Sequence, residues 1–279
     1  MPYKSIVTFT RDVTRDRGVI DTALGLAESE GGHLSAVCLG IDRIQPGAYY
    51  AGANAIALQQ SMDEAQSEAN AAEQDARDAL KGASATWDTT ALAVQLGTLG
   101  HVVASRAEFA DLVVLPKPYG EGRGQEDVAI LESALFGTRA PVLVVPLGQR
   151  DRLATDRIMI GWNQSAEALA AVRAALPLLV RAKAVDIAII DPPAHGPDRS
   201  DPGGLLAEML ARHGVRADIS VLARTMPRVS DVMCRHAGDI EADLIVMGAY
   251  GHSRLREAIL GGATRNMLEA SAVPVFMAH

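Results

Sequence analysis

The sequence predicts an α/β protein made of two similar units, each a doubly wound, five-stranded parallel sheet flanked by helices. Apolar runs of strand length alternate with longer segments of helical periodicity, and this alternation is typical of a parallel sheet covered on both faces. The chain also repeats itself. The run A-D-L-V-V-L-P from Ala110 returns as A-D-L-I-V-M-G from Ala242, and A-P-V-L-V-V from Ala140 corresponds to V-P-V-F-M-A from Val273, at offsets of 132 and 133 residues. The 279 residues are therefore expected to form two domains.

The expected elements follow the same order in both halves. In the first half we expect strands at residues 5–10, 34–40, 86–94, 111–115 and 141–146. In the second half we expect strands at 157–162, 185–190, 217–223, 243–247 and 274–278, with helices at 166–182, 205–212, 229–237 and 263–270. A short polar stretch, L-G-Q-R-D-R, separates the halves and predicts domains at residues 1–148 and 153–279.

A long polar helix over residues 58–80 distinguishes the first half. Its apolar residues recur at intervals of three and four and form a narrow stripe of mostly alanine: Leu58, Met62, Ala65, Ala69, Ala72, Ala76 and Leu80. We interpret it as a helix that covers its own sheet and turns a charged face to solvent. A helix that binds a partner is the alternative.

The composition excludes several classes of protein. The formal charge is −8, from 26 basic and 34 acidic residues, so no basic excess favours DNA binding. The longest apolar runs have strand length, well below the roughly 18 residues of a membrane span. The sequence M-P-Y-K leads directly into the first strand, so we expect no export signal. Cys38 and Cys234 are the only cysteines, which argues against a disulfide framework or a thiolate metal site and fits a reducing cytoplasm.

A glycine-rich loop in the second half carries the main functional signal. Gly248 and Gly251 follow the apolar strand at 243–247, and Gly261 and Gly262 directly precede the helical run A-T-R-N-M-L. Glycine allows a sharp turn and removes side chains that would block a ligand. Free N–H groups at the start of a helix suit an anion. The pattern therefore predicts a phosphate-binding loop.

The spacing G-x-x-G, nine residues, then G-G-x-T resembles the nucleotide-binding signature of the universal stress protein family, G-2x-G-9x-G-[S/T]. Gly248, Gly251 and Gly261 fall on the three family glycines, Gly262 replaces the usual serine or threonine, and Thr264 falls where many members carry a second hydroxyl. The resemblance implies a Rossmann-like fold and binding of ATP or AMP, with Mg²⁺ accompanying a triphosphate. It assigns the phosphates to Gly251, Gly261, Gly262 and Thr264.

The resemblance also places contacts to the adenosine. The first strand of the family usually ends in an acid, and here Asn163 begins the run N-Q-S at that place. The backbone of Ile189 would meet the adenine edge, and the set is completed by Met247, Gly248 and Ala263. Asn163 and Ser165 are also ordinary helix caps, and for Ser165 we favour the cap.

The first half departs from this pattern. The run L-P-K-P-Y-G from Leu115 replaces G-x-x-G, and its two prolines lack the N–H donors that a phosphate needs. We therefore expect a degenerate copy that supports the second half. The later run G-E-G-R-G from Gly120, with Glu126 and Asp127 close behind, is interpreted as a flexible loop, with anion binding as the alternative.

Enzyme signatures are missing from both halves. The sequence contains no G-x-x-x-x-G-K-[S/T], G-x-S-x-G or H-E-x-x-H, and its histidines do not cluster. The segment 191–202 is interpreted as a solvated turn; a weak metal site or a mobile lid built on Asp191, His195, Asp198 and Asp201 is the alternative.

Three functional hypotheses follow. The leading one is a cytoplasmic, adenine-nucleotide-binding stress-response protein that works through ligand-dependent conformation or association. The family resemblance implies pairing of residues 142–145 with 275–278 in an intrachain pseudo-dimer, and it leaves open a homodimer of whole chains. The second hypothesis is a nucleotide-free interaction module, and the third is a slow ATPase or autophosphorylating protein in which Thr264 or Ser253 accepts phosphate.

Overall fold

The structure is a computed structural model that describes residues 3–44, 54–148, 153–192, 201–249 and 262–279. The chain divides into two compact units. The N-terminal unit comprises Pro2–Val142 with Leu147–Arg152, and the C-terminal unit comprises Leu143–Pro146 with Leu153–His279.

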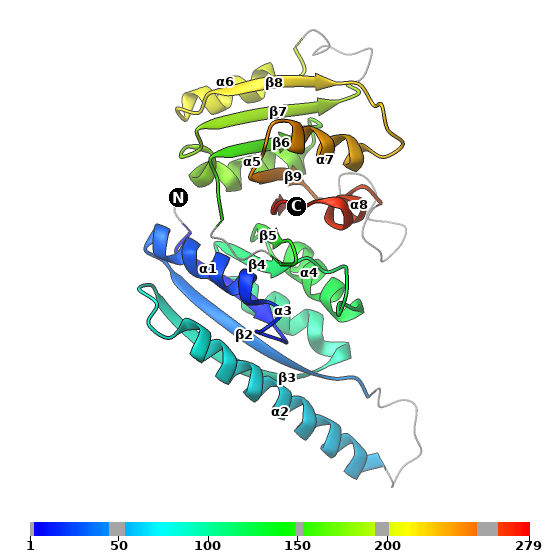
Figure 1. Cartoon of the computed structure of the whole chain (residues 1–279). Helices are drawn as coiled ribbons and strands as arrows, with labels where there is room; N and C mark the ends of the chain where they lie inside the picture. Colours follow the sequence, from blue (N-terminus) through cyan, green and yellow to red (C-terminus); the bar gives the residue numbers. More distant parts are fainter. Residues whose placement is uncertain (1–2, 45–53, 149–152, 193–200, 250–261) are drawn as a thin grey trace. The chain divides into compact units, whose positions relative to one another are not determined.

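The N-terminal unit has a parallel sheet with strand order β3-β2-β1-β4 (Figure 1). Its strands are β1 (Ser5–Thr10), β2 (His33–Asp42), β3 (Thr86–Gln95) and β4 (Leu112–Pro116). Its helices are α1 (Arg17–Glu30), α2 (Asn54–Leu80), α3 (Leu99–Ala107) and α4 (Gln125–Gly137), with a short 3₁₀ turn, η2 (Leu96–Thr98).

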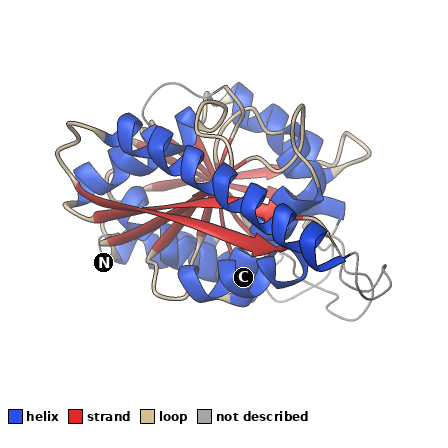
Figure 2. Cartoon of the chain, turned by 90° about the horizontal axis from the view of Figure 1, so that it is seen from below, coloured by secondary structure: helices blue, strands red, loops and turns tan. Residues whose placement is uncertain are grey.

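Helix α2 lies over β2 and β3 of its own sheet (Figure 2). Ala65, Ala69 and Ala76 are at most 2% exposed, so the interpretation as a sheet-covering helix is confirmed for this stripe. The small side chains let the backbones approach closely. A Cβ atom placed on Gly40 of β2 would lie 1.7 Å from the carbonyl oxygen of Ala65, so this contact requires glycine.

The C-terminal unit contains five parallel strands in the order β10-β9-β6-β7-β8. The strands are β6 (Arg157–Gly161), β7 (Ala184–Ile190), β8 (Ala217–Leu222), β9 (Leu244–Gly248) and β10 (Val275–Ala278). The helices are α5 (Ala166–Leu179), α6 (Gly204–Arg212), α7 (Val229–Asp239) and α8 (Gly262–Ala270). Strand β5 (Val142–Val145) lies beside β10 in the strand order.

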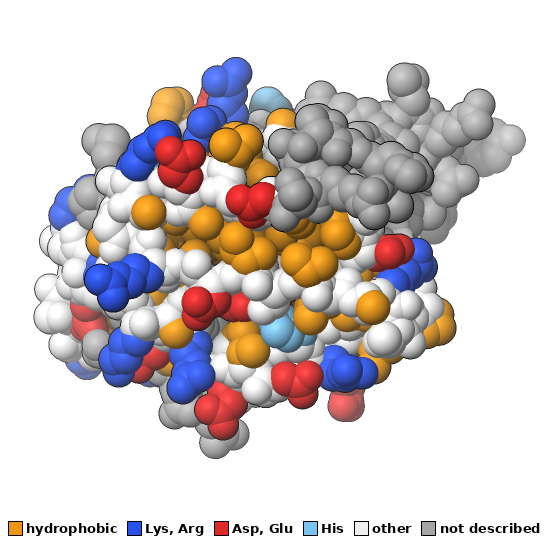
Figure 3. Space-filling model, turned by 90° about the horizontal axis from the view of Figure 1, so that it is seen from above, with side chains coloured by type: hydrophobic (Ala, Val, Ile, Leu, Met, Phe, Trp, Pro, Cys, Tyr) orange, Lys and Arg blue, Asp and Glu red, His pale blue; other side chains and the backbone are white. Residues whose placement is uncertain are grey.

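The outer edge of this sheet, at β8, is partly apolar. Ile219 and Val221 of β8 and Leu205 of α6 are 39%, 55% and 76% exposed. Figure 3 looks onto this side of the C-terminal unit, where apolar side chains form a band. An exposed edge strand leaves backbone N–H and C=O groups unpaired along its outer side.

The predicted fold class is confirmed. The expected strands and helices are present, and their ends differ by a few residues at most: the helix expected at 166–182 ends at Leu179, and the one expected at 58–80 begins at Asn54. None of the helices in the described part of the chain has the length and apolar content that crossing a bilayer requires.

Candidate functional site

The strand order of the C-terminal unit reverses between β6 and β9. The chain runs outward from β6 through β7 to β8 and then returns to β9 on the other side of β6. Doubly wound sheets bind ligands at such a reversal, beyond the carboxyl ends of the strands. Gly161, the last residue of β6, pairs with Met247 of β9. The structure therefore brings Asn163, Met247 and Gly248 to the same end of the sheet.

Gly248 ends β9 directly against the start of α5. A Cβ atom at this position would lie 2.4 Å from the backbone nitrogen of Ala168 and 2.7 Å from the carbonyl carbon of Glu167. These are backbone atoms, which cannot rotate away as a flexible side chain could. Glycine is therefore required here for packing of the strand on the helix, in addition to any role in a ligand-binding loop.

The turn between β6 and α5 is fixed by its own polar side chains. Asn163 Oδ1 accepts a hydrogen bond from the Ser165 backbone N–H at 3.1 Å, and Ser165 Oγ accepts one from the Ala168 N–H at 3.1 Å. Gln164 between them has φ 62°, in the left-handed region. The prediction that Ser165 caps the helix is confirmed. Asn163 is exposed at the mouth of the turn, and its amide group carries two further donor hydrogens.

The remaining expected site residues differ in their exposure. Helix α8 begins at Gly262, where Gly262 and Ala263 are exposed, whereas Thr264 is only 4% exposed. Ile189 of β7 is also 4% exposed. Gly251 and Gly261 lie outside the described residues, as do Ser253, His195 and Asp198. The start of α8 thus presents backbone N–H groups next to small residues, a suitable surface for an anion.

Sequence reasoning missed a further contact made by Trp162. Its indole Nε1–H donates to the carbonyl oxygen of Pro202 at 3.2 Å, and Gln164 Nε2 donates to the same oxygen at 3.4 Å. These bonds connect the turn after β6 to the chain that enters α6. A tryptophan at the end of an apolar strand was the available signal, because a buried indole usually needs an acceptor.

Comparison with known proteins identifies the family. Residues 154–279 match the sequence model of the universal stress protein family. The C-terminal half of the chain belongs to the universal stress protein family. Universal stress protein Slr1230 of Synechocystis is 29% identical over 72 residues, and this alignment covers 26% of the present chain and 24% of that relative. The chain thus matches about a quarter of that curated relative.

The likeness in fold extends over the whole chain, to solved structures of similar length. A universal stress protein from Archaeoglobus fulgidus superimposes with a TM-score of 0.71 at 15% identity, over 98% of this chain and 97% of that one. A protein of unknown function from Pseudomonas aeruginosa superimposes with a TM-score of 0.56 at 15% identity, over 99% and 92%. At these identities the likeness concerns the fold.

A second polar cluster of the universal stress protein unit connects α7 to the sheet. Asp186 of β7 accepts a hydrogen bond from Ser220 of β8 at 2.6 Å through Oδ2, and its Oδ1 lies 2.9 Å from Nε2 of His236 on α7. The carboxylate lies between the serine and the histidine, so the imidazole is not placed to take the serine proton. The cluster therefore joins elements and is not a nucleophile. Among the described residues no group of three metal-ligating side chains is present.

The N-terminal unit has an equivalent end of its sheet. The pairing of β1 with β4 starts with Ile6 opposite Leu112. The pairing of β6 with β9 starts in the same way, with Ile158 opposite Leu244. Matching these pairs along the strands equates Arg11 with Asn163, Leu115 with Met247, and Pro116 with Gly248. The two ends thus share backbone positions and differ in chemistry.

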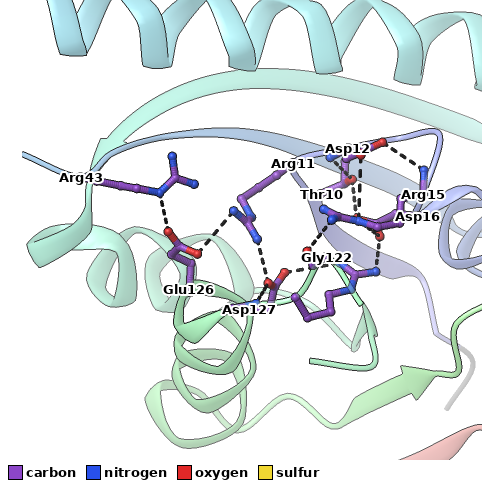
Figure 4. A network of polar contacts seen from close by, with 11 residues as sticks. Thr10, Arg11, Asp12, Arg15, Asp16, Arg43, Gly122, Glu126 and Asp127 are labelled. Carbon is purple, nitrogen blue, oxygen red and sulfur yellow. Dashed lines mark hydrogen bonds and ion pairs between the residues drawn. The ribbon is translucent and has the colours of Figure 1, made fainter. Parts of the chain in front are cut away.

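An ion-pair network occupies this end of the N-terminal unit (Figure 4). Arg11 Nη2 lies 2.7 Å from Asp127 Oδ2, and Arg11 Nη1 lies 3.6 Å from Glu126 Oε2. Glu126 Oε1 also accepts a hydrogen bond from Arg43 Nε at 2.6 Å, and this bond raises the pKa of the Arg43 guanidinium. Arg11 on the β1 end is therefore connected directly to the first turn of α4.

Arg123 is at the centre of the network, and the interpretation of its segment as a flexible loop was wrong for this residue. Its side chain is only 2% exposed and forms ion pairs with Asp16 and, at 3.4 Å, with Asp127. Asp16 also accepts a hydrogen bond from Thr10 at 2.8 Å. The composition of G-E-G-R-G indicated a flexible loop, but partners that are distant in sequence bury its arginine. The space left beside the network is on the order of one water molecule.

Proposed function

We propose that this chain is an adenine-nucleotide-binding universal stress protein that takes ATP or AMP in its C-terminal unit. The observation that supports this proposal most strongly is the position of Asn163, Met247 and Gly248 at the reversal of strand order between β6 and β9. A nucleotide at that place lies where doubly wound sheets bind their ligands. Helix α8, which follows β9, begins with Gly262 and Ala263 and offers amide donors for phosphate.

In this proposal the adenosine and ribose lie against Asn163, Ile189, Met247 and Gly248. The phosphates are held by the loop and the start of α8, through Gly251, Gly261, Gly262, Ala263 and Thr264. Because the Thr264 side chain is buried, we expect the amides of Gly262 and Ala263 to contribute more than its hydroxyl. Mg²⁺ would accompany a triphosphate, bound through phosphate oxygens and water.

We further propose that residues 1–148 and 153–279 act as a degenerate and a nucleotide-binding domain. The ligand would change conformation or association in a stress response, through the intrachain pseudo-dimer and a homodimer. Neither Cys38 nor Cys234 forms a disulfide, which fits a reducing cytoplasm.

Calorimetric titration with ATP and AMP in the presence of Mg²⁺ tests the proposal. The variants are Gly251→Val in the loop and Gly262→Val at the helix start. A Cβ atom at Gly262 has no described atom within 4 Å, so the fold should tolerate the change while the side chain blocks the phosphates. Gly97→Val is a matched control, since Gly97 is equally open and lies in the N-terminal unit.

The expected result is micromolar binding to the wild type, a loss of at least about tenfold in both loop variants, and unchanged binding in the control. Absence of binding to wild-type protein shown to carry no copurified nucleotide would favour the interaction module instead. Two observations support that second candidate: Gly262 replaces the family hydroxyl, and the Asn163 side chain already accepts a bond within its own turn.

The slow ATPase or autophosphorylating protein is the third candidate. Thr264 would have to leave its buried position to accept a phosphoryl group. Release of phosphate from ATP by the wild type, compared with Thr264→Ala, tests this candidate. Equal and negligible rates in the two proteins would eliminate it.

A further inference from the structure

We propose that the N-terminal unit contains an oxyanion site that the protein's own Asp127 carboxylate occupies. The site is built from Arg11, Arg123 and the backbone start of α4, and it would take inorganic phosphate or sulfate when the carboxylate is removed. This proposal concerns the N-terminal unit and does not depend on nucleotide binding by the C-terminal unit.

The carboxylate of Asp127 lies at the start of α4, where an anion would bind. Helix α4 follows β4 as α8 follows β9, so the start of α4 lies at the carboxyl end of its own sheet, as the start of α8 does. Asp127 lies in the first turn of α4, and its Oδ2 accepts a hydrogen bond from the Gly124 N–H at the helix start at 2.7 Å. Backbone N–H groups at a helix start are the donors that bind phosphate in many proteins.

The set of donors around Asp127 is the second argument. Besides the bond from the Gly124 N–H, the Asp127 carboxylate accepts hydrogen bonds from Arg11 Nη2 at 2.7 Å and from Arg123 Nη1 at 3.4 Å. A helix start with two converging guanidinium groups is a suitable set of donors for a tetrahedral oxyanion. Asp127 is 6% exposed, so the whole arrangement is largely shielded from water.

Unused donors are the third argument. The Nε atoms of Arg11 and Arg123, the two arginines that contact Asp127, are buried and have no hydrogen-bond partner within the described part of the chain. Buried donors without partners are rare, because each loses its bonds to water. A carboxylate offers two oxygens, whereas phosphate and sulfate offer four. The larger anion could therefore reach donors that Asp127 leaves unpaired.

Charge and space explain why the native carboxylate stays in place. The network contains four arginines and four acids and is formally neutral: Arg11, Arg15, Arg43, Arg123, Asp12, Asp16, Glu126 and Asp127. The remaining space is on the order of one water molecule, too small for an oxyanion. An anion is expected to enter only when the side chain of Asp127 is shortened.

The test is thermal unfolding of Asp127→Ala in phosphate, in sulfate and in chloride at equal ionic strength. Alanine removes one negative charge and opens space. In chloride we expect a lower Tm than in the wild type, and at tens of millimolar phosphate we expect a rise of about 3 °C or more above the change in the wild type. Asp127→Asn removes the same charge but keeps the space filled, so it should gain no such rise.

Two further variants locate the effect. Glu208→Ala breaks an exposed arginine–carboxylate pair in the C-terminal unit and should respond to phosphate as the wild type does. Arg11→Gln combined with Asp127→Ala should lose the specific rise. If Asp127→Ala does not fold in chloride, recovery of folded protein on refolding in phosphate is the measurement. A purely structural ion-pair network predicts equal losses in every salt, and that result would overturn the proposal.

Discussion

Gly248→Ala is the substitution that most directly tests how β9 and α5 determine the geometry of the candidate site. The added Cβ atom would lie 2.4 Å from the Ala168 nitrogen and within 3 Å of two further backbone atoms. Real Cβ atoms essentially never approach so closely, so α5 or β9 must shift. Overpacking of this kind costs about 1–3 kcal/mol. For a unit of this size, about 2 kcal/mol corresponds to a decrease in Tm of roughly 7 °C.

Urea unfolding followed by circular dichroism measures the loss, and Gly238→Ala is the matched control. Gly238 lies in α7, where a Cβ atom would meet nothing within 4 Å. Alanine there should leave stability unchanged or raise it by up to about 1 kcal/mol, because it favours the helix. If Gly248→Ala stays within about 0.5 kcal/mol of the wild type, or if Gly238→Ala loses as much, close backbone packing is not the reason for glycine at position 248.

Three other substitutions or measurements test the packing. Gly40→Ala should cost about 3 kcal/mol in urea unfolding, since its Cβ atom would overlap the Ala65 carbonyl; equal stability would contradict the proposed contact of α2 with β2. Ser165→Ala should cost about 1 kcal/mol through loss of the helix cap, measured in the same way. Burial raises the pKa of the Cys38 thiol from 9.0 to about 12, so at pH 8 a thiol reagent should modify Cys234 in the native protein and reach Cys38 only after unfolding. Because the unfolded thiol ionises near pH 9 whereas the buried thiol stays protonated up to about 12, the free energy of unfolding should decrease as the pH rises through this range, and a flat stability curve would contradict the shift.

Much of the fold could be predicted from sequence because its signals are local. The strands of the two halves are apolar runs bounded by polar residues, and the repeat confirmed their order. The alanine stripe of α2 is a periodic pattern that one helix carries by itself. Ser165 as a helix cap depends on a residue only three positions away. Each of these inferences needs no knowledge of how distant segments meet.

The polar clusters could not be predicted because they join distant segments. Arg123 pairs with Asp16 across 107 positions, and His236 lies beside Asp186 across 50. No spacing rule connects such residues, so the glycine-rich run that contains Arg123 was interpreted as a flexible loop. Burial of a charged side chain is stable only when oppositely charged partners are supplied by tertiary structure. The need for glycine at position 248 could not be predicted either, because the close packing of β9 on α5 is visible only in the structure.

The two helices at the carboxyl ends of the sheets differ in their first turns, and this difference connects the two proposals. The start of a helix carries a partial positive charge and unpaired N–H groups, which favour a negative partner. Helix α4 supplies that partner itself with Glu126 and Asp127, whereas the first turn of α8 contains no acidic residue. In the N-terminal unit the N–H groups at the start of α4 are therefore paired with a carboxylate of the same chain, whereas in the C-terminal unit those of α8 are left for an external anion. From this contrast we expect one nucleotide per chain, and a measured stoichiometry of two would contradict both the occupancy of the N-terminal unit by Asp127 and the assignment of a single site.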